Sequence, residues 1–101
     1  MNKRDLVGKM AIDAQLTRAQ AARALDALLQ SIQSTLARGG RVTISGFGTF
    51  AVSHRKARTV RNPQSGRAME IAARSVPRFA PGADLKTVIR TLPPALRQSG
   101  P

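Results

Sequence analysis

The sequence predicts an α+β fold: a helical hairpin, a small antiparallel sheet with a long protruding β-hairpin arm, and a short C-terminal helix. Three observations lead to this prediction. Apolar residues recur at helical spacing over residues 1–40, the period changes to two from Arg41 onward, and residues 53–78 are rich in basic side chains but poor in large apolar ones. The chain has 101 residues without an internal repeat, so we expect one domain.

Two helix starts stand out in residues 1–40. Asn2 can cap a first helix that has Asp5 in its first turn, and Thr17 followed by Gln20 is a capping box. The second helix carries one apolar stripe and ends at Gly39-Gly40. A DNA-reading helix-turn-helix is the alternative, but the second helix is too long and too apolar to read a groove. We therefore expect both helices to form the core, and the core of a dimer.

The segments 41–53 and 75–82 are predicted to form the sheet. Val42 and Ile44 alternate with polar residues, and the glycines at 46 and 48 indicate a bend between short strands. The aromatic residues are expected to pack in the core, and base stacking on them is the weaker alternative. The residues expected in the dimer core are Phe47, Phe50, Phe79, Leu29, Ile32 and Leu36.

Residues 54–74 are predicted to form the protruding arm. The tip is the turn cluster Asn62-Pro63-Gln64-Ser65-Gly66, in which Pro and Gly have clear geometric uses. An unsupported hairpin is only marginally stable in water, so we expect the arm to be flexible when free and ordered when bound. Between residues 53 and 78, seven basic residues outnumber the single acid Glu70, which gives a net charge of +6. The seven are Arg55, Lys56, Arg58, Arg61, Arg67, Arg74 and Arg78.

The C-terminal part begins with Pro81-Gly82, which precede a predicted helix over residues 83–92. Leu85, Val88, Ile89 and Leu92 are available for its apolar face. Pro93-Pro94 is expected to stop it, and residues 93–101 read as a flexible tail.

The charge balance indicates the class of partner. Lys and Arg number 17 against 5 Asp and Glu, a formal net charge of +12, so we expect a polyanion: DNA, RNA or an anionic membrane surface. With three Phe and no Trp or Tyr the apolar core is thin, and self-association would supply the missing burial. The chain has no Cys, no bilayer-length apolar run and no signal-peptide pattern, so we expect a cytoplasmic protein.

No enzyme is predicted. His54 is the only histidine and has no cysteine or clustered carboxylates near it, so it is interpreted as a polar arm residue rather than a metal ligand or acid–base group. The five acids are scattered, and no Gly-rich phosphate loop or nucleophile motif is present. We therefore expect no catalytic site, metal or cofactor.

Several motifs together resemble one family, the bacterial HU/IHF histone-like DNA-bending proteins, from Met1 to about Arg90. They are "MNKRDLVGKMA", the Thr17 capping box, "GFGTF", "HRKARTVRNPQSG" and "VPRFAPGADLK". The order of Gly-Phe, Phe, basic residues and Asn-Pro is the specific part. The chain departs from the usual family pattern at Val60, where Gly or Ala is common, at Ser65 in place of Thr, and at Glu70, where Lys is more frequent.

The resemblance implies an intertwined dimer whose two arms reach around DNA, with residues 1–92 as the DNA-binding domain and residues 1–40 as its helical dimerisation part. Proteins of this family insert apolar wedges such as Pro into the minor groove and kink the duplex. Pro63 would be that wedge, and Arg61 and Asn62 would contact the groove beside it. The residues that would lie along the groove and the phosphates are Arg55, Lys56, Arg58, Arg67 and Arg74. Lys3 and Lys86 would touch flanking phosphates, and Arg78 is a further candidate for DNA contact.

The function that follows is a histone-like, nucleoid-associated protein, most simply an HU-type homodimer, that bends and compacts double-stranded DNA with little sequence specificity. Bent, nicked or flexible DNA would be preferred. One alternative is an IHF-type subunit with site preference and a different partner chain. The other is a basic RNA-binding or ribosome-associated protein, which the absence of an aromatic RNA motif disfavours, although structured RNA remains a second class of partner. Membrane binding is disfavoured because the charge lies on a hairpin rather than opposite an apolar helix face.

Overall fold

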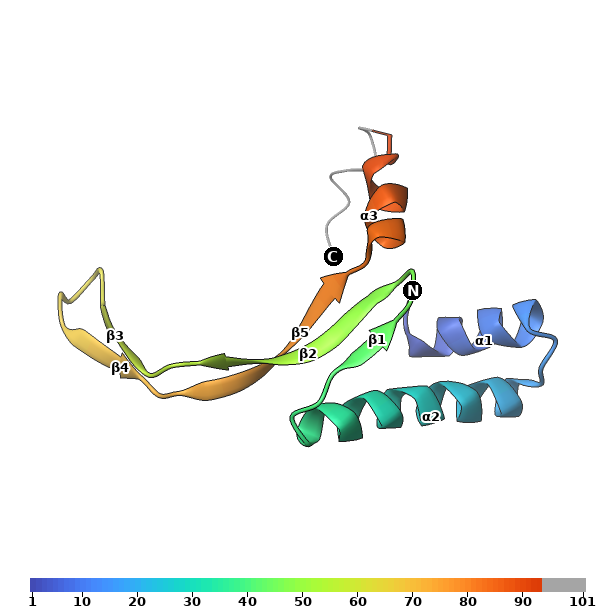
Figure 1. Cartoon of the computed structure of the whole chain (residues 1–101), viewed down its shortest axis with the longest axis horizontal. Helices are drawn as coiled ribbons and strands as arrows, with labels where there is room; N and C mark the ends of the chain where they lie inside the picture. Colours follow the sequence, from blue (N-terminus) through green and yellow to red (C-terminus); the bar gives the residue numbers. More distant parts are fainter. Residues whose placement is uncertain (94–101) are drawn as a thin grey trace.

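The computed structural model describes residues 1–93 of the chain (Figure 1). Helices α1 (Lys3–Asp13) and α2 (Arg18–Ala37) form the predicted helical hairpin. At the start of α2, the Thr17 hydroxyl accepts from the Gln20 N–H at 3.1 Å and the Gln20 side chain accepts from the Thr17 N–H at 3.0 Å. Asn2 and Asp5 exchange the same pair of bonds before α1, at 2.9 and 3.2 Å. Both predicted helix starts are therefore confirmed, and each one is a reciprocal capping box.

The end of α2 is also the predicted one. Gly39 has a φ of +80°, its N–H donates to the Leu36 carbonyl at 2.9 Å, and the Gly40 N–H donates to the Thr35 carbonyl at 3.0 Å. These two bonds form a Schellman motif, which requires a left-handed residue that glycine adopts without strain. The α1–α2 connection holds a less expected feature, because Gln15 has a φ of +56°.

A three-stranded antiparallel sheet follows, with the strand order β1-β2-β5. Its strands are β1 (Val42–Ile44), β2 (Gly48–Arg55) and β5 (Arg74–Pro81), and β2 lies in the centre. The turn between β1 and β2 places Gly46 at a φ of +78°, as the predicted bend requires. The predicted sheet limits are slightly short, since β2 and β5 pair as far as Arg55 opposite Arg74.

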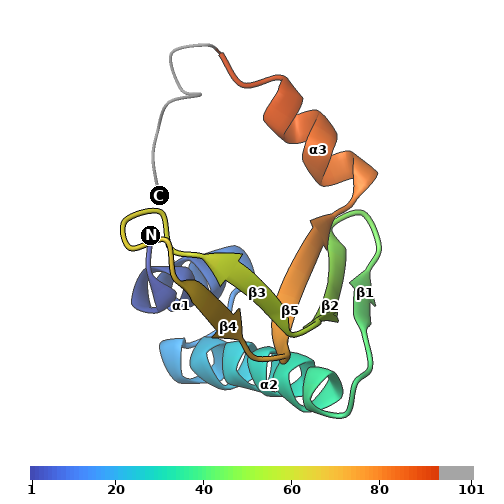
Figure 2. The ribbon, with the colours of Figure 1, turned by 90° about the vertical axis from the view of Figure 1, so that its left-hand side faces the viewer.

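The predicted arm is present as a second sheet, formed by β3 (Arg58–Arg61) and β4 (Ala68–Ile71). It extends far from the helices (Figure 1), and Figure 2 shows the same molecule viewed with the arm toward the reader. The radius of gyration is 19.0 Å, whereas a compact domain of this length has one of about 13 Å. The hairpin is not one continuous ladder, however, because residues 56–57 and 72–73 lie between the two sheets and belong to neither.

Helix α3 (Ala83–Arg90) ends two residues before the predicted limit of 92. The reason is local: Pro93 disfavours helical geometry at the residue before it, so the helix ends ahead of Leu92. Of the predicted tail, residues 93–101, only Pro93 lies within the described residues. None of the described helices is long and apolar enough to cross a membrane.

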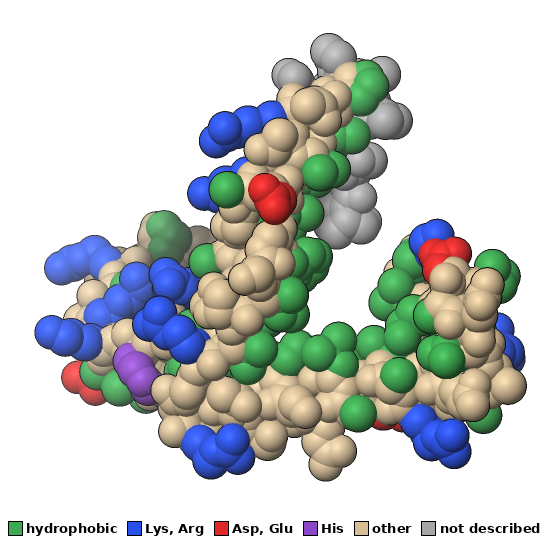
Figure 3. All heavy atoms as spheres, turned by 45° about the vertical axis from the view of Figure 1, so that its right-hand side comes forward, with side chains coloured by type: hydrophobic (Ala, Val, Ile, Leu, Met, Phe, Trp, Pro, Cys, Tyr) green, Lys and Arg blue, Asp and Glu red, His purple; other side chains and the backbone are tan. Residues whose placement is uncertain are grey.

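The core of the single chain is small. Among residues 1–93, the only buried hydrophobic side chains are those of Val7, Ala21 and Leu25. Of the predicted dimer-core residues, Phe47 is 44 % exposed, Phe79 39 % and Leu29 38 %, while Phe50, Ile32 and Leu36 are half-buried. The three Phe rings form a cluster, with centroids 5.4 Å apart for Phe47 and Phe79 and 4.8 Å apart for Phe50 and Phe79. Figure 3 shows apolar side chains lining the concave side of the molecule, between α3 and the helical hairpin.

Candidate nucleic-acid interface

The candidate interface begins on one face of the β2–β5 ladder. Side chains alternate between the two faces of a strand, and directly paired residues share a face. Arg78 pairs with Ala51 and Arg74 pairs with Arg55, so the three arginines lie on the same face. The opposite face carries Phe50 and Phe79. The register thus places Arg78 on the same face as Arg55 and Arg74. In the sequence, Arg78 was only a further candidate for contact with DNA.

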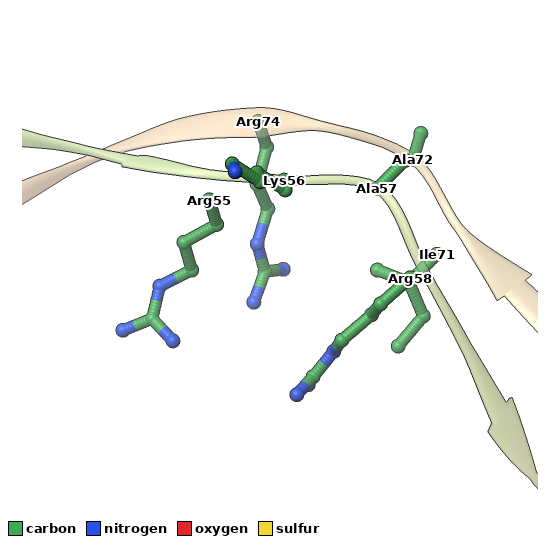
Figure 4. A pocket seen from close by; sticks show the side chains of 7 residues that line it. All are labelled: Arg55, Lys56, Ala57, Arg58, Ile71, Ala72 and Arg74. Atoms are coloured by element: carbon green, nitrogen blue, oxygen red, sulfur yellow. The ribbon is translucent and has the colours of Figure 1, made fainter.

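The break between the two sheets continues this arrangement onto the arm. Arg58 is three residues after Arg55, so an unbroken ladder would place the two side chains on opposite faces. The bend at residues 56–57 and 72–73 interrupts this alternation of side chains between the two faces. As a result, the side chains of Arg55, Arg58 and Arg74 all point to the inner side of the bend (Figure 4). We call this bend the elbow.

The elbow encloses a hollow of ≈ 280 Å³. Its lining residues are Arg55, Lys56, Ala57, Arg58, Ile71, Ala72 and Arg74. Four of them are cations, and the small residues between them leave the hollow open. No carboxylate lies within ion-pair distance of any arm cation in residues 1–93. The elbow therefore carries an uncompensated positive charge that an anion can neutralise.

Beyond the elbow, the two faces of the β3–β4 hairpin differ in character. Arg58 pairs with Ile71 and Val60 pairs with Met69, so these four residues share the face that continues the inner side of the elbow. We call this the inner face of the arm. Thr59, Arg61, Ala68 and Glu70 lie on the outer face. The acid that departs from the family pattern is thus separated from the inner arginines by the hairpin itself.

The tip is organised by Asn62. Its N–H donates to the Arg67 carbonyl and its own carbonyl accepts from the Gly66 N–H, both at 2.8 Å. Its Oδ1 accepts from the N–H groups of Gln64 and Ser65, at 2.9 and 3.5 Å, which is the side-chain turn that Asn favours. Gly66 has a φ of +71°. Pro63 lies within this turn and is exposed, where its missing N–H leaves no ladder bond unmade.

Two of the predicted groove residues are therefore engaged within the arm. Asn62 uses its side chain to hold the turn, and Arg61 donates from Nη1 to the Gly66 carbonyl at 3.2 Å. Both contacts lie within the turn that carries Pro63. The DNA contacts that the resemblance implies for Arg61 and Asn62 stay a prediction, and the structure adds that both side chains form hydrogen bonds within the tip.

The two predicted body cations lie apart from the arm. Lys3, on α1, forms an ion pair with Asp26 at 2.7 Å, and both side chains are mostly exposed. Lys86 is exposed on α3. Within the described part of the chain, neither residue lines the elbow.

His54 occupies a structural position at the base of the arm. Its Nδ1 lies 2.8 Å from the Ser75 hydroxyl, directly across the β2–β5 ladder. Within residues 1–93 no group of three His, Cys, Asp or Glu side chains could hold a metal ion. The interpretation of His54 as a polar arm residue agrees with this hydrogen bond.

Comparisons with known proteins identify the family. The family model described as bacterial DNA-binding protein matches residues 1–90. HU-beta of Escherichia coli K12 is 48 % identical over 89 residues, which cover 88 % of this chain and 99 % of the relative. HRL18 of Rhizobium leguminosarum is 45 % identical over 91 residues, which cover 90 % of this chain and 100 % of the relative.

Solved structures of HU proteins have the same fold. The Anabaena HU–DNA cocrystal structure matches with a TM-score of 0.82 and 39 % identity, over 91 % of this chain and 100 % of that one. HU from Thermotoga maritima matches with a TM-score of 0.64 and 30 % identity, over 88 % of this chain and 98 % of that one. The chain therefore belongs to the bacterial HU family of histone-like, non-enzymatic DNA-binding proteins.

Proposed function

We propose that this HU-type protein acts as a homodimer that bends and compacts double-stranded DNA, with its two arms along the minor groove and Pro63 of each arm wedged into the base stack. One observation carries the proposal. One basic face runs from the body of the protein, around the elbow and toward the tip that holds Pro63. It is formed by Arg78, Arg74, Arg55 and Arg58.

The spacing of the basic face suits a row of phosphates. Arg74 and Arg78 are four residues apart on one strand, which corresponds to about 13 Å. Each DNA strand carries a phosphate about every 3.4 Å along the helix axis, so two arginines at this distance meet different phosphates. Guanidinium groups bind phosphate through paired, charge-assisted hydrogen bonds. We assign them to phosphate contact, which holds the duplex without reading its sequence.

The tip supplies the part that deforms the duplex. Pro63 is a rigid apolar ring in a turn that is held by hydrogen bonds between Asn62 and Gln64 and between Arg61 and Gly66. Unstacking a base step costs on the order of a few kcal/mol, and a bent duplex offsets this cost by touching more protein surface. Two basic arms hold the duplex while it is strained. Flexible, nicked or already bent DNA costs less to deform and is therefore preferred.

The homodimer is inferred from the small core. Three buried hydrophobic side chains cannot stabilise a domain of this size, and the exposed Phe47, Phe79 and Leu29 are the side chains that a second copy would cover. Residues 1–40 would then supply the helical part of the interface. With its DNA-binding function, the protein is expected in the cytoplasm, on the nucleoid.

The wedge is tested by Pro63→Ala, with Gln64→Ala as the matched control in the same turn. Bending is measured by energy transfer between dyes at the two ends of a short duplex. We expect Pro63→Ala to keep its fold and bind DNA but to lose most of the bending, while the control bends DNA like the parent. Equal bending by Pro63→Ala and the parent would refute the wedge.

The preference for deformable DNA is tested by competition among linear, nicked and bent duplexes and duplex RNA. Stronger binding to RNA than to DNA would favour the RNA-binding alternative.

A further inference from the structure

The inner face of the arm contains a sulfur atom that the DNA-binding function does not require. Met69 lies on β4 opposite Val60, and its side chain is 48 % exposed. Its Sδ accepts a hydrogen bond from Asn62 Nδ2 at 3.9 Å. Asn62 is the residue whose Oδ1 holds the Gln64 and Ser65 N–H groups of the tip. A single amide group therefore connects the Met69 sulfur to the turn that carries Pro63.

We propose that Met69 is a reversible oxidation site, at which conversion to methionine sulfoxide weakens DNA binding and bending by this arm. The inference rests on the proposed function, because it assumes that the inner face meets DNA. The thioether of methionine is accessible to a peroxide here because half of the side chain is exposed on a hairpin that protrudes from the body. Oxidation makes this flexible apolar side chain polar and chiral.

The chemical step balances with a peroxide as the oxidant. A lone pair on Sδ forms a bond to one peroxide oxygen, the O–O bond breaks, and the other oxygen leaves as water. Sulfur loses two electrons and the peroxide gains two. Reduction by a methionine sulfoxide reductase reverses the change: two thiols give up two electrons, form a disulfide, and release the oxygen as water.

Two consequences follow from the position of Met69. The sulfoxide oxygen is a far stronger acceptor than a thioether, so it draws the Asn62 amide away from its present position and disturbs the turn. The same oxygen lies on the face shared with Arg58, Val60 and Ile71, where it faces DNA phosphates with a negative dipole. Both changes should reduce the insertion of Pro63 into DNA. The first alters the shape of the tip, and the second weakens the contact between the inner face of the arm and the phosphates.

The other methionines provide an internal comparison. Met1 is 83 % exposed at the N-terminus, and Met10 is half-buried against the core of the helical hairpin. Exposure alone would make Met1 the most reactive of the three, but neither residue touches the arm. The effect on DNA should therefore follow the oxidation of Met69 and not the total sulfoxide content.

The test compares the parent with Met69→Leu, which keeps an apolar side chain of similar volume and retains Met1 and Met10. Each protein is treated with hydrogen peroxide, sulfoxide is quantified at each methionine by mass spectrometry, and duplex binding and bending are measured. We expect the treated parent to bind at least about fivefold more weakly, as for one misplaced polar group. Treated Met69→Leu should bind like untreated Met69→Leu, and a methionine sulfoxide reductase should restore the parent. Equal losses in both proteins, or no loss in the parent once Met69 is oxidised, would overturn the inference.

A second readout separates this inference from the proposed function. The backbone amide resonances of Gln64 and Ser65 in the free protein should shift when Met69 is oxidised, because both donate to Asn62. Unchanged resonances would contradict the coupling through Asn62. If Arg74→Gln and Pro63→Ala also leave DNA binding and bending intact, the proposed function fails; if only the oxidation effect is missing, the inference fails alone.

Discussion

Arg74 offers the sharpest test of the basic face, because its removal should have opposite effects on DNA binding and on the free protein. Arg74 lies directly opposite Arg55 at the end of the β2–β5 ladder, and no carboxylate of residues 1–93 is paired with either. Like charges at directly opposed strand positions destabilise a sheet by roughly 0.2–1 kcal/mol. Arg74→Gln should therefore leave the free protein equally stable or slightly more stable, while on the proposed function it removes one phosphate contact from each arm.

The size of the binding effect follows from counterion release. Each neutralised phosphate contributes about −0.9 to the slope of log K against log salt. In the proposed homodimer, which has one Arg74 on each of two arms, the slope should become less steep by about 1.8. Between about 50 and about 200 mM salt, the parent should lose roughly twelvefold more affinity than the variant loses.

The assay is a titration of a short duplex at several salt concentrations, beside thermal unfolding of the free protein. Lys9→Gln is the matched control, because it removes the same charge from α1, away from the arm. Lys9 pairs with Asp13 at 2.9 Å, and the hydrogen bond and charge of Asp13 raise its pKa above 10.5, so it is charged at neutral pH. The reasoning fails if Arg74→Gln leaves the slope unchanged, or if both variants change it equally.

Three further predictions concern stability. Phe79→Ala should destabilise the protein by about 3–5 kcal/mol if a second copy buries the ring, and the unfolding temperature should depend on protein concentration; a small, concentration-independent effect would contradict the homodimer. Gly48→Ala should cost about 1–3 kcal/mol in chemical denaturation, because a Cβ there would lie 2.6 Å from the Phe79 ring. Thr17→Ala should cost about 1 kcal/mol by the same measurement through loss of the α2 cap, and an unchanged midpoint would show that Gln20 alone suffices.

The features that the sequence predicted well are those that depend on neighbouring residues. The capping box at Thr17, the helix end at Gly39-Gly40 and the turn at Gly46 are each determined within a few positions, and all three are confirmed. The end of α3 was placed two residues too late, although the deciding signal was present, because the restriction that Pro93 imposes on Leu92 is also local.

The arrangement of the site was less accessible, because it depends on which residues pair across strands. The sequence identified the basic residues of the arm and its tip, but not the interruption of the ladder at residues 56–57 and 72–73. That interruption places Arg58 on the same side as Arg55. Similarly, the sequence did not reveal that the Asn62 side chain forms hydrogen bonds with Gln64 and Met69 within the arm, and its expected contact with DNA stays a prediction.

The elbow has two features that destabilise a sheet, unpaired strand residues and two directly opposed arginines. A bound phosphate would compensate for both. Four residues there forgo ladder pairing, and two arginines face each other at the last paired position. In a sheet selected only for stability, either feature would be a defect; such local violations are expected where function requires them. On the proposed function, a phosphate between Arg55 and Arg74 would replace their repulsion with two charge-assisted hydrogen bonds and would stabilise the curvature of the arm. DNA binding and ordering of the arm should thus be coupled, because the phosphates of the duplex supply the negative charge that the elbow lacks.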